Sequence, residues 1–289
     1  MTRRPPKDVG ASVRARLLNR ARAEGRVFQE LATLYAMERF LYRLGRSDEV
    51  ENFILKGGLT VALWAGEQAR VTRDIDLLGR GSSSVAEVVE RIGRVLGTSV
   101  APDGVVFDSG SLEGTEIAVE TRYVGVRVRF GADLGGMRLH MQVDVGFGDA
   151  VVPPPDWLTY PELLDLGSPR VLGYPAAATL AEKLHAVCSL GLVNTRMKDY
   201  YDLWTGSRLG VVGPAELGRA VRHAFERRGT AVPQSLPEGL TAAFSADPIK
   251  NVQWDAFLRK GGLSAPSLAE VVEFVGVAVE EAFREARRG

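Results

Sequence analysis

The sequence predicts an α/β protein, of the α+β kind, in which a sheet with flanking helices is followed by a helical domain. Three observations predict this class. Apolar residues recur at helical spacing over residues 11–45 and again near the C-terminus. Residues 104–147 instead contain runs in which apolar and polar side chains alternate, the pattern of β-strands. Three consecutive prolines at 153–155 separate these parts, so we predict a sheet domain over residues 1–160 and a helical domain over residues 161–289.

The composition is that of an ordinary globular protein. Of the 289 residues, 45% are hydrophobic and 25% are charged, and the length suits two domains. The chain has no run of about 18 uncharged apolar residues, and its Arg-rich start lacks the apolar stretch of a signal peptide. We therefore expect a cytoplasmic protein that does not contact a membrane. The single cysteine, Cys188, lies in an apolar helix-like segment and is predicted to be a core residue without a redox role.

The first 46 residues are basic, although the net charge of the chain is zero. They hold eleven Lys and Arg residues against four acids, a local excess of seven positive charges. Such an excess is suited to contact with nucleic acid. Alternatively, Arg14 to Arg26 are only the solvated side of an amphipathic helix. The apolar spacing predicts that helix over residues 11–45, with Gly25 as a candidate division and Gly45 as its end.

The stretch from Lys56 to Thr60 is predicted to bind phosphate. A short apolar run at residues 53–55 has strand character and leads into Gly57 and Gly58, and a helix-compatible apolar segment follows over residues 59–65. Glycines let the backbone approach a ligand closely. The amides of a first helical turn have no partner within the helix and face an anion with the positive end of the helix dipole. Strand, glycine turn and helix together therefore suit a phosphate.

Acidic residues alternate with apolar ones directly after this stretch. In residues 74–77, Asp74 and Asp76 alternate with Ile and Leu, so on a strand both carboxylates point to one face. Two carboxylates side by side require a cation. A loop over residues 79–84 and a helix over residues 85–96 are expected next, with the helix packed on the sheet.

A third acid lies in the strand predicted over residues 139–147. Asp144 shares its face with His140 and Gln142, opposite the apolar side chains, and glycines follow it. A lone acid there needs a cation or a hydrogen-bond donor. One alternative is an ion pair across the sheet with Arg127 or Arg129. The other is a metal site, because three carboxylates from two strands suit two Mg²⁺ ions that hold a triphosphate and activate a hydroxyl.

Helices are predicted for the rest of the chain. Pro175 opens a helix over residues 176–190, on which Lys183 lies off the most apolar line, as do Glu182 and His185. A shorter helix over residues 195–204 places Lys198 and Asp202 at i,i+4 and Asp199 at i,i+3 to Asp202. Three or four further helices are expected over residues 213–288, and no catalytic pattern is found there.

Five motifs, taken in order, resemble one protein family. They are Lys-Gly-Gly, Arg-Val-Thr-Arg-Asp-Ile-Asp-Leu, Gln-Val-Asp-Val, Ala-Glu-Lys-Leu-His-Ala and Arg-Met-Lys-Asp-Tyr-Tyr-Asp-Leu, within residues 53–204. Their order and spacing are similar to those of the AbiEii/AbiGii nucleotidyltransferase toxins, which include the MenT toxins of mycobacteria. The resemblance implies a fold like that of DNA polymerase β, with a mixed sheet, and membership of a toxin–antitoxin pair. It also implies Mg²⁺-dependent transfer of nucleotides from an NTP, pyrimidines in some relatives, to RNA such as the 3′ acceptor end of tRNA.

The resemblance also implies roles for individual residues. Asp74 and Asp76 match the metal-binding pair, and Asp144 would be the third ligand, placed to help deprotonate the attacking hydroxyl. Lys183 matches a lysine that would neutralise charge on the departing pyrophosphate, and Asp199 is the expected active-site group of the next helix. Residues of the nucleotide-binding set are Lys56, Gly57, Gly58, Thr60, Arg70, Thr72, Lys183, Lys198 and Asp202.

Some of these assignments carry alternatives. Leu59 follows the glycines where many relatives have Thr, and Thr60 comes one position later. Asp202 is expected to orient Lys198. His185 is either a general base or a residue outside the chemistry, the second being commoner for a helical His.

Two further expectations concern charge near the acids. Arg70 and Arg73 flank them, either as simple ion-pair partners or as contacts to triphosphate or RNA. Thr72 stands where relatives carry a hydroxyl that is modified to silence the toxin, and phosphate there would add about two negative charges beside the acids.

Alternative functions remain open from the sequence. One is nucleotidyl transfer to a protein hydroxyl or to a small molecule such as an aminoglycoside. The other is a non-catalytic binding module that keeps the fold. The basic N-terminal segment favours RNA as the acceptor, and the intact acids favour an enzyme.

Overall fold

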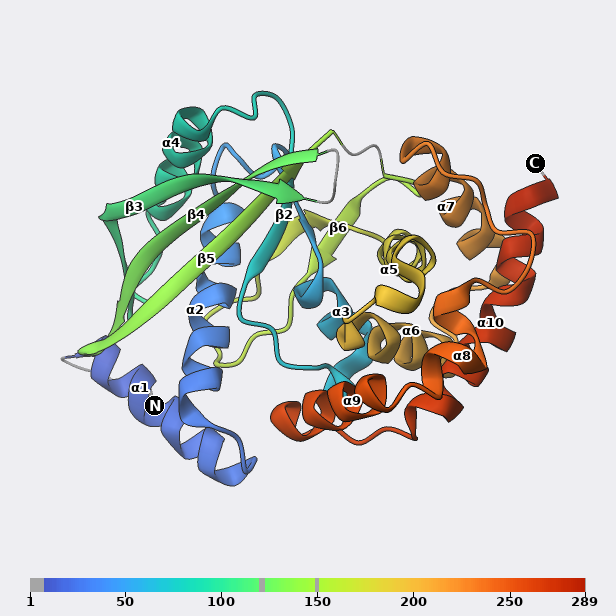
Figure 1. Ribbon diagram of the computed structural model, residues 1–289. Coiled ribbons are helices and arrows are strands. Elements are labelled where there is room, and N and C mark those ends of the chain that lie inside the picture. The colour runs from blue at the N-terminus through green and yellow to red at the C-terminus, as the bar shows by residue number, and fades with distance from the viewer. Residues whose placement is uncertain (1–7, 120–122, 149–150, 289) are drawn as a thin grey trace. The chain divides into compact units, whose positions relative to one another are not determined.

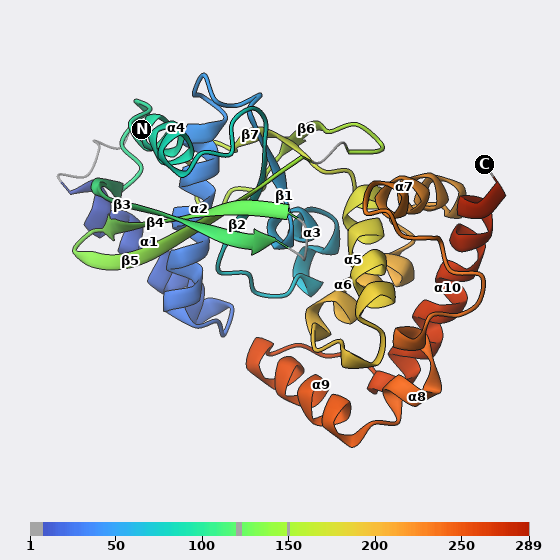
Figure 2. The same cartoon turned by 45° about the horizontal axis from the view of Figure 1, so that its top comes forward.

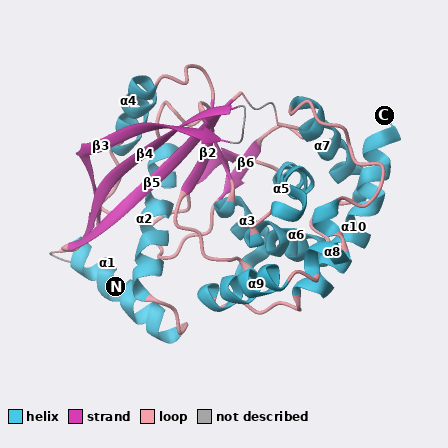
Figure 3. Ribbon diagram, in the orientation of Figure 1, coloured by secondary structure: helices cyan, strands magenta, loops and turns pink. Residues whose placement is uncertain are grey.

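A computed structural model describes residues 8–119, 123–148 and 151–288 (Figures 1 and 3). The first half alternates helices and strands, and helices alone follow. The elements, in chain order, are α1 Val9–Ala23, α2 Phe28–Leu44, β1 Phe53–Lys56, α3 Gly58–Ala65, β2 Ile75–Gly79, α4 Val85–Leu96, β3 Val105–Val119, β4 Tyr123–Leu134, β5 Met137–Phe147, β6 Asp156–Thr159, β7 Arg170–Gly173, α5 Ala176–Leu190, α6 Met197–Leu209, α7 Pro214–Arg227, α8 Ala242–Ser245, α9 Pro248–Gly261 and α10 Leu268–Arg288.

The chain forms two compact units. We call the first the sheet unit; it comprises Met1–Leu59, Val71–Asp149 and Asp156–Gly173. The second, the helical unit, comprises Thr60–Arg70, Ala150–Pro155 and Tyr174–Gly289. The predicted single division at residue 160 differs from this arrangement. Strand β7 pairs with β1 and so keeps the chain in the sheet unit up to residue 173, while most of α3 packs with the later helices.

The sheet unit is built on a mixed sheet with the strand order β3-β4-β5-β2-β1-β7-β6. Strand β2 runs parallel to β5, and β1 runs parallel to β7, while the other neighbours are antiparallel. Helices α2 and α4 contact each other and β4, so they cover the same face of the sheet (Figures 1 and 2). The alternate, apolar residues of β4 and β5 are buried, among them Val128 and Val143 at 0% exposure. The polar residues between them project from the opposite face.

Charged side chains help to hold the sheet unit together. Arg43 on α2 makes a buried ion pair with Asp103, with 2.7 Å between Nη1 and Oδ2. Arg39 is fully buried, pairs with Glu38 and donates to the carbonyl of Gly167 at 2.7 Å. The basic excess of the N-terminal segment is therefore used in part for packing. The alternative of a solvated helix face concerned Arg14 to Arg26, and of these Arg14, Arg16, Arg22 and Arg26 are exposed, as that alternative expects.

The helical unit has its core between α5, α6, α7 and α10. Buried side chains at their contacts include Leu184, Tyr200, Phe225 and Val275. The segment Ala176–Val193 is long and apolar enough to cross a membrane by length and composition, but 61% of it is buried inside the protein. Its apolar character is therefore accounted for by this core.

Most elements agree with the sequence-based expectation. The N-terminal helix divides at Gly25, whose φ is +64°, and the helices at 85–96 and 176–190 are confirmed. Strands β6 and β7 were not predicted. Each has only four residues and little alternation, and they pair with each other in register over Asp156–Thr159 and Arg170–Gly173.

Candidate active site

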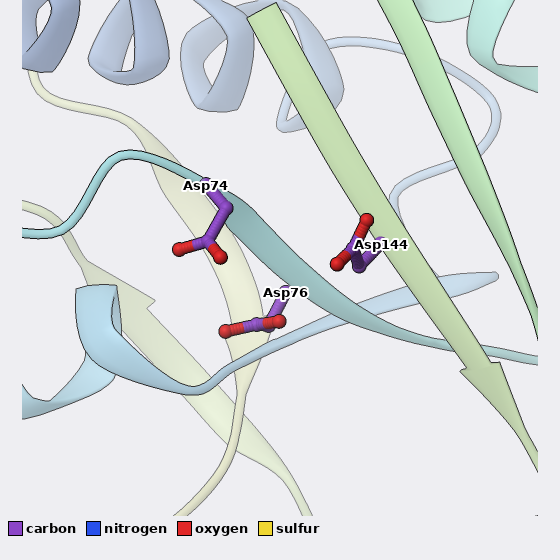
Figure 4. Close-up of side chains that lie close together, drawn as sticks. All are labelled: Asp74, Asp76 and Asp144. Atoms are coloured by element: carbon purple, nitrogen blue, oxygen red, sulfur yellow. The ribbon is translucent and has the colours of Figure 1, made fainter. Parts of the chain in front are cut away.

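Three carboxylates come together on the open face of the sheet unit. Strand β2 lies parallel to β5 with Asp76 directly opposite Asp144, and Asp74 immediately precedes β2. Ligand oxygens from the three residues lie within 4.8 Å of one another (Figure 4). All three side chains are partly exposed. The predicted cluster of three acids is thus present, with Asp76 and Asp144 on neighbouring strands and Asp74 at the residue before β2 instead of within it. A donor set made only of carboxylate oxygens suits hard cations such as Mg²⁺.

The glycine turn lies directly against this cluster. Gly57 has a φ of +71°, and a Cβ on it would lie 2.1 Å from Oδ2 of Asp76. Both the left-handed backbone and the close approach therefore require glycine. Lys56 pairs in register with Asp76, and its Nζ lies 3.8 Å from the position of a Cβ on Gly146. The turn and the lysine are thus next to the strands that carry the acids.

Asp144 is also bound by an arginine of the neighbouring strand. Arg127 lies opposite it on β4, with 2.8 Å from Nε to Oδ1 and 2.7 Å from Nη2 to Oδ2. Gln142 donates to Oδ2 at 3.3 Å. The hydrogen bond to Asp144 raises the pKa of Arg127 despite partial desolvation, and the charges of Asp144, Asp74 and Asp76 raise it further. The ion-pair alternative for Asp144 is therefore correct for Arg127, and the same acid also belongs to the carboxylate cluster.

Thr72 and Arg73 precede the first acid. The hydroxyl of Thr72 donates to Oδ1 of Asp74 at 3.0 Å. Arg73 pairs with Glu30 at 2.9 Å and has 63% of its side chain exposed. Thr72 is thus in the cluster's immediate surroundings, whereas Arg73 has the simple ion pair that was one of its two expected roles.

A second group of charges is buried in the helical unit. Nζ of Lys183 on α5 lies 3.1 Å from Oδ1 of Asp199 and 2.7 Å from Oδ2 of Asp202, both on α6. Arg70 donates from Nε to both oxygens of Asp202, at 3.0 and 3.1 Å, and Arg196 contacts Asp199 at 2.6 Å. Both acids are 0% exposed. These five residues form what we call the buried charge cluster; four of them are largely buried, and Arg196 lies at its edge with 42% of its side chain exposed.

The partners decide the charge states in this cluster. Burial acts to lower the pKa of Lys183, but Asp202 and Asp199 outweigh it and the pKa is raised. Burial acts to raise the pKa of Asp199, but Lys183 and Arg196 outweigh it and the pKa is lowered. Lys183 and Asp199 are therefore a charged pair, as a buried lysine and a buried acid must be to remain ionised.

Several predicted residues have other surroundings than expected. Asp202 binds Arg70 and Lys183, so the expectation that it orients Lys198 is wrong, and Lys198 is exposed. Thr60 is 1% exposed, and its hydroxyl is 3.4 Å from that of Thr179 in the helical unit, so its expected contact with phosphate stays a prediction. The physical reason for this burial is that α3 turns its Thr60 face toward the helices.

His185 has a structural environment. It is 5% exposed, its Nε2 is 3.0 Å from the hydroxyl of Thr230, and its ring packs edge-on against Phe225. The alternative that places it outside the chemistry agrees with these contacts. From the sequence, Arg127 was expected only as one alternative ion-pair partner of Asp144, and Arg196, two positions before Lys198, was given no role.

Comparisons with known proteins give a consistent result. A protein-family model described as "Nucleotidyl transferase AbiEii toxin, Type IV TA system" matches residues 39–287. No curated protein matches the chain. A Helicobacter pylori crystal structure described as that of a "putative nucleotidyltransferase" aligns with a TM-score of 0.52 at 13% identity, over 89% of this chain and 96% of that one. Another, of JHP933 from Helicobacter pylori, aligns with a TM-score of 0.51 at 14% identity, over 89% and 93% of the two chains. At this identity the two structures establish the likeness of fold.

Proposed function

Because the chain belongs to the AbiEii family of nucleotidyltransferase toxins of type IV toxin–antitoxin systems, we propose that it is a cytoplasmic enzyme that transfers a nucleotide from an NTP to RNA. The acceptor we propose is the 3′ end of tRNA, and the donor a pyrimidine NTP. A nucleotide added there would block aminoacylation and translation. The observation that supports this proposal most directly is the cluster of Asp74, Asp76 and Asp144 beside a glycine turn.

The carboxylate cluster is proposed to hold two Mg²⁺ ions. Its donors are all carboxylate oxygens within 4.8 Å, and Gly57 leaves the space next to Asp76 free of a side chain. Bound Mg²⁺ would neutralise charge on the triphosphate and make the acceptor hydroxyl more acidic. In the reaction a bond forms between the acceptor oxygen and the α-phosphorus, and the bond to the β-phosphate oxygen breaks, releasing pyrophosphate. We assign the hydroxyl proton to the carboxylate of Asp144, the residue that the family resemblance places nearest the nucleophile.

The glycine turn is proposed to bind the triphosphate. Backbone amides after Gly57 and Gly58 can donate to phosphate oxygens without a Cβ in the way, and Lys56 adds a positive charge on the same side of the sheet. With the hydroxyl of Thr60 directed toward Thr179, backbone donors are the proposed ligands.

Lys183 and Asp199 are retained as predictions from the family resemblance. Lys183 would neutralise charge that develops on pyrophosphate. Its ammonium already contacts two buried acids, so stabilisation of the helical unit is the competing role. If Lys183 acts in catalysis, a variant lowers the catalytic rate. If it stabilises the helical unit, a variant lowers the unfolding free energy.

Thr72 is proposed as the place where the antitoxin acts. A type IV toxin has a cognate antitoxin, and the Thr72 hydroxyl is bonded to Asp74. A phosphate on this hydroxyl would carry about two negative charges into contact with a metal-binding acid and would compete for the cations. Thr72→Asp should therefore abolish toxicity while Thr72→Ser retains it, as measured by growth on induction. A toxic Thr72→Asp variant would contradict this role.

The proposed function is tested with purified protein, total tRNA, Mg²⁺ and each labelled NTP in turn, followed by sequencing of the tRNA 3′ ends. We expect added pyrimidines with the wild type and none with Asp74→Ala, whose fold should be intact by circular dichroism. Parallel incubations with total protein and with an aminoglycoside test the other acceptors. Label in either of these and none in tRNA would reject the RNA proposal.

A further inference from the structure

Arg127 makes an ion pair with Asp144, one of the three carboxylates of the proposed metal site. It binds both oxygens of Asp144 through two nitrogens, at 2.8 and 2.7 Å, and Gln142 donates to one of them as well. A paired arrangement of this kind is the strongest form of Arg–carboxylate contact. A cation that binds Asp144 directly must therefore either displace this guanidinium or share the carboxylate with it.

The surroundings of Arg127 supply the reason for such a contact. Three carboxylates within 4.8 Å repel one another, and Arg127 makes an ion pair with one of them, Asp144. Its side chain is 30% exposed, against 14% for Asp144, so the guanidinium lies on the open side of the pair. A guanidinium released from Asp144 would have an anion to bind as soon as a triphosphate is present, since arginine binds phosphate in the same two-pronged geometry.

We propose that Arg127 is a positioning residue. When nucleotide is absent it stays bound to the carboxylate of Asp144, and when the cations bind it moves to a phosphate of the incoming NTP. This inference rests on the proposed function. This movement makes cation binding and nucleotide binding mutually dependent. The cation can bind Asp144 only when Arg127 has left it for a phosphate of the nucleotide. Such coupling must be reciprocal. Without a substrate, Asp144 would then keep a positively charged partner, so that one of the three carboxylates is neutralised.

The test uses Mn²⁺ as the probe and measures its affinity by calorimetry, with and without a non-hydrolysable NTP analogue. In Arg127→Gln, Mn²⁺ alone should bind more tightly than in wild type, because it no longer competes with a guanidinium for Asp144; we expect a gain on the order of 10-fold, equivalent to about 1.4 kcal/mol. The NTP analogue should bind Arg127→Gln more weakly than wild type. In wild type the analogue should raise the affinity for Mn²⁺, and in Arg127→Gln this increase should be lost. Arg127→Lys should give intermediate values, since it keeps the charge but not the two-pronged contact.

A matched control is available on the same strand. Arg129 lies two residues further along β4, on the same face, but opposite Gln142 instead of an acid. Arg129→Gln removes an equal charge and should leave Mn²⁺ affinity unchanged. Equal effects of the two substitutions, or an Mn²⁺ affinity that Arg127→Gln leaves unchanged or weakens, would overturn the proposal.

Failure of the inference can be told apart from failure of the proposed function. If wild type transfers nucleotides and Asp74→Ala does not, while Arg127→Gln binds Mn²⁺ as wild type does, only the role of Arg127 is refuted. If neither wild type nor Arg127→Gln binds Mn²⁺, both proposals fall. Thermal unfolding of each variant without Mn²⁺ establishes that the compared proteins are folded.

Discussion

Replacing Gly57 by alanine should remove activity while leaving most of the fold. The new Cβ would lie 2.1 Å from Oδ2 and 2.8 Å from Cγ of Asp76, distances that no real Cβ contact shows. Either the turn or the carboxylate must move by about 1 Å, a displacement that can cost on the order of 100-fold in rate at a catalytic site. The φ of +71° adds a backbone cost of roughly 1–2 kcal/mol for a residue with a Cβ.

Gly25→Ala separates these two effects. Gly25 has a φ of +64° and no neighbouring atom within 4 Å of the point where a Cβ would lie, so it carries the backbone cost without the collision. The assay is the initial rate of label transfer from NTP, together with urea unfolding of both variants. We expect Gly57→Ala to lose at least as much unfolding free energy as Gly25→Ala, and we expect a loss of rate in Gly57→Ala alone. A Gly57→Ala enzyme as active as Gly25→Ala would refute the reasoning that the turn holds Asp76 in place.

Two further predictions concern buried charge. Burial raises the pKa of Glu38 from 4.5 to about 7 against the lowering effect of Arg39, so its contribution to stability is complete below pH 4.5 and is lost as the pH rises to about 7. Between these pH values the unfolding free energy of the wild type should fall relative to Glu38→Gln by about 3 kcal/mol, and a pH-independent difference would contradict this. Lys183→Met should cost about 3–5 kcal/mol of unfolding free energy, because it leaves two acids with fewer partners, and Lys183→Met combined with Asp202→Asn should recover part of the loss. If Lys183→Met keeps wild-type stability and loses only rate, the lysine serves catalysis instead.

The carboxylate cluster could be predicted in large part from the sequence. Alternation fixes the faces of Asp74 and Asp76 on a strand, and the isolated position of Asp144 in an apolar strand marks it as a residue in need of a partner. The parallel pairing that places Asp76 opposite Asp144 is a contact between strands about 70 residues apart, and local periodicity holds no information about such pairing. The family resemblance supplied that link.

The buried charge cluster could not be predicted from the sequence in the same way. Helical periodicity placed Lys183 off the apolar face, yet it is 7% exposed because acids on another helix neutralise it. Arg70 is likewise taken up by Asp202, more than 130 positions away. The burial of Thr60 depends on the direction in which the short helix α3 packs. These features depend on tertiary contacts, which composition and spacing do not determine.

The most direct test of the central claim is the amount of label that becomes covalently attached to RNA when the protein is incubated with Mg²⁺ and labelled NTPs. Wild type should label RNA, and Asp76→Asn, which alters one member of the carboxylate cluster with almost no change in size, should lower the rate by several orders of magnitude. Equal labelling by the two proteins would contradict the claim that the carboxylate cluster is the active site.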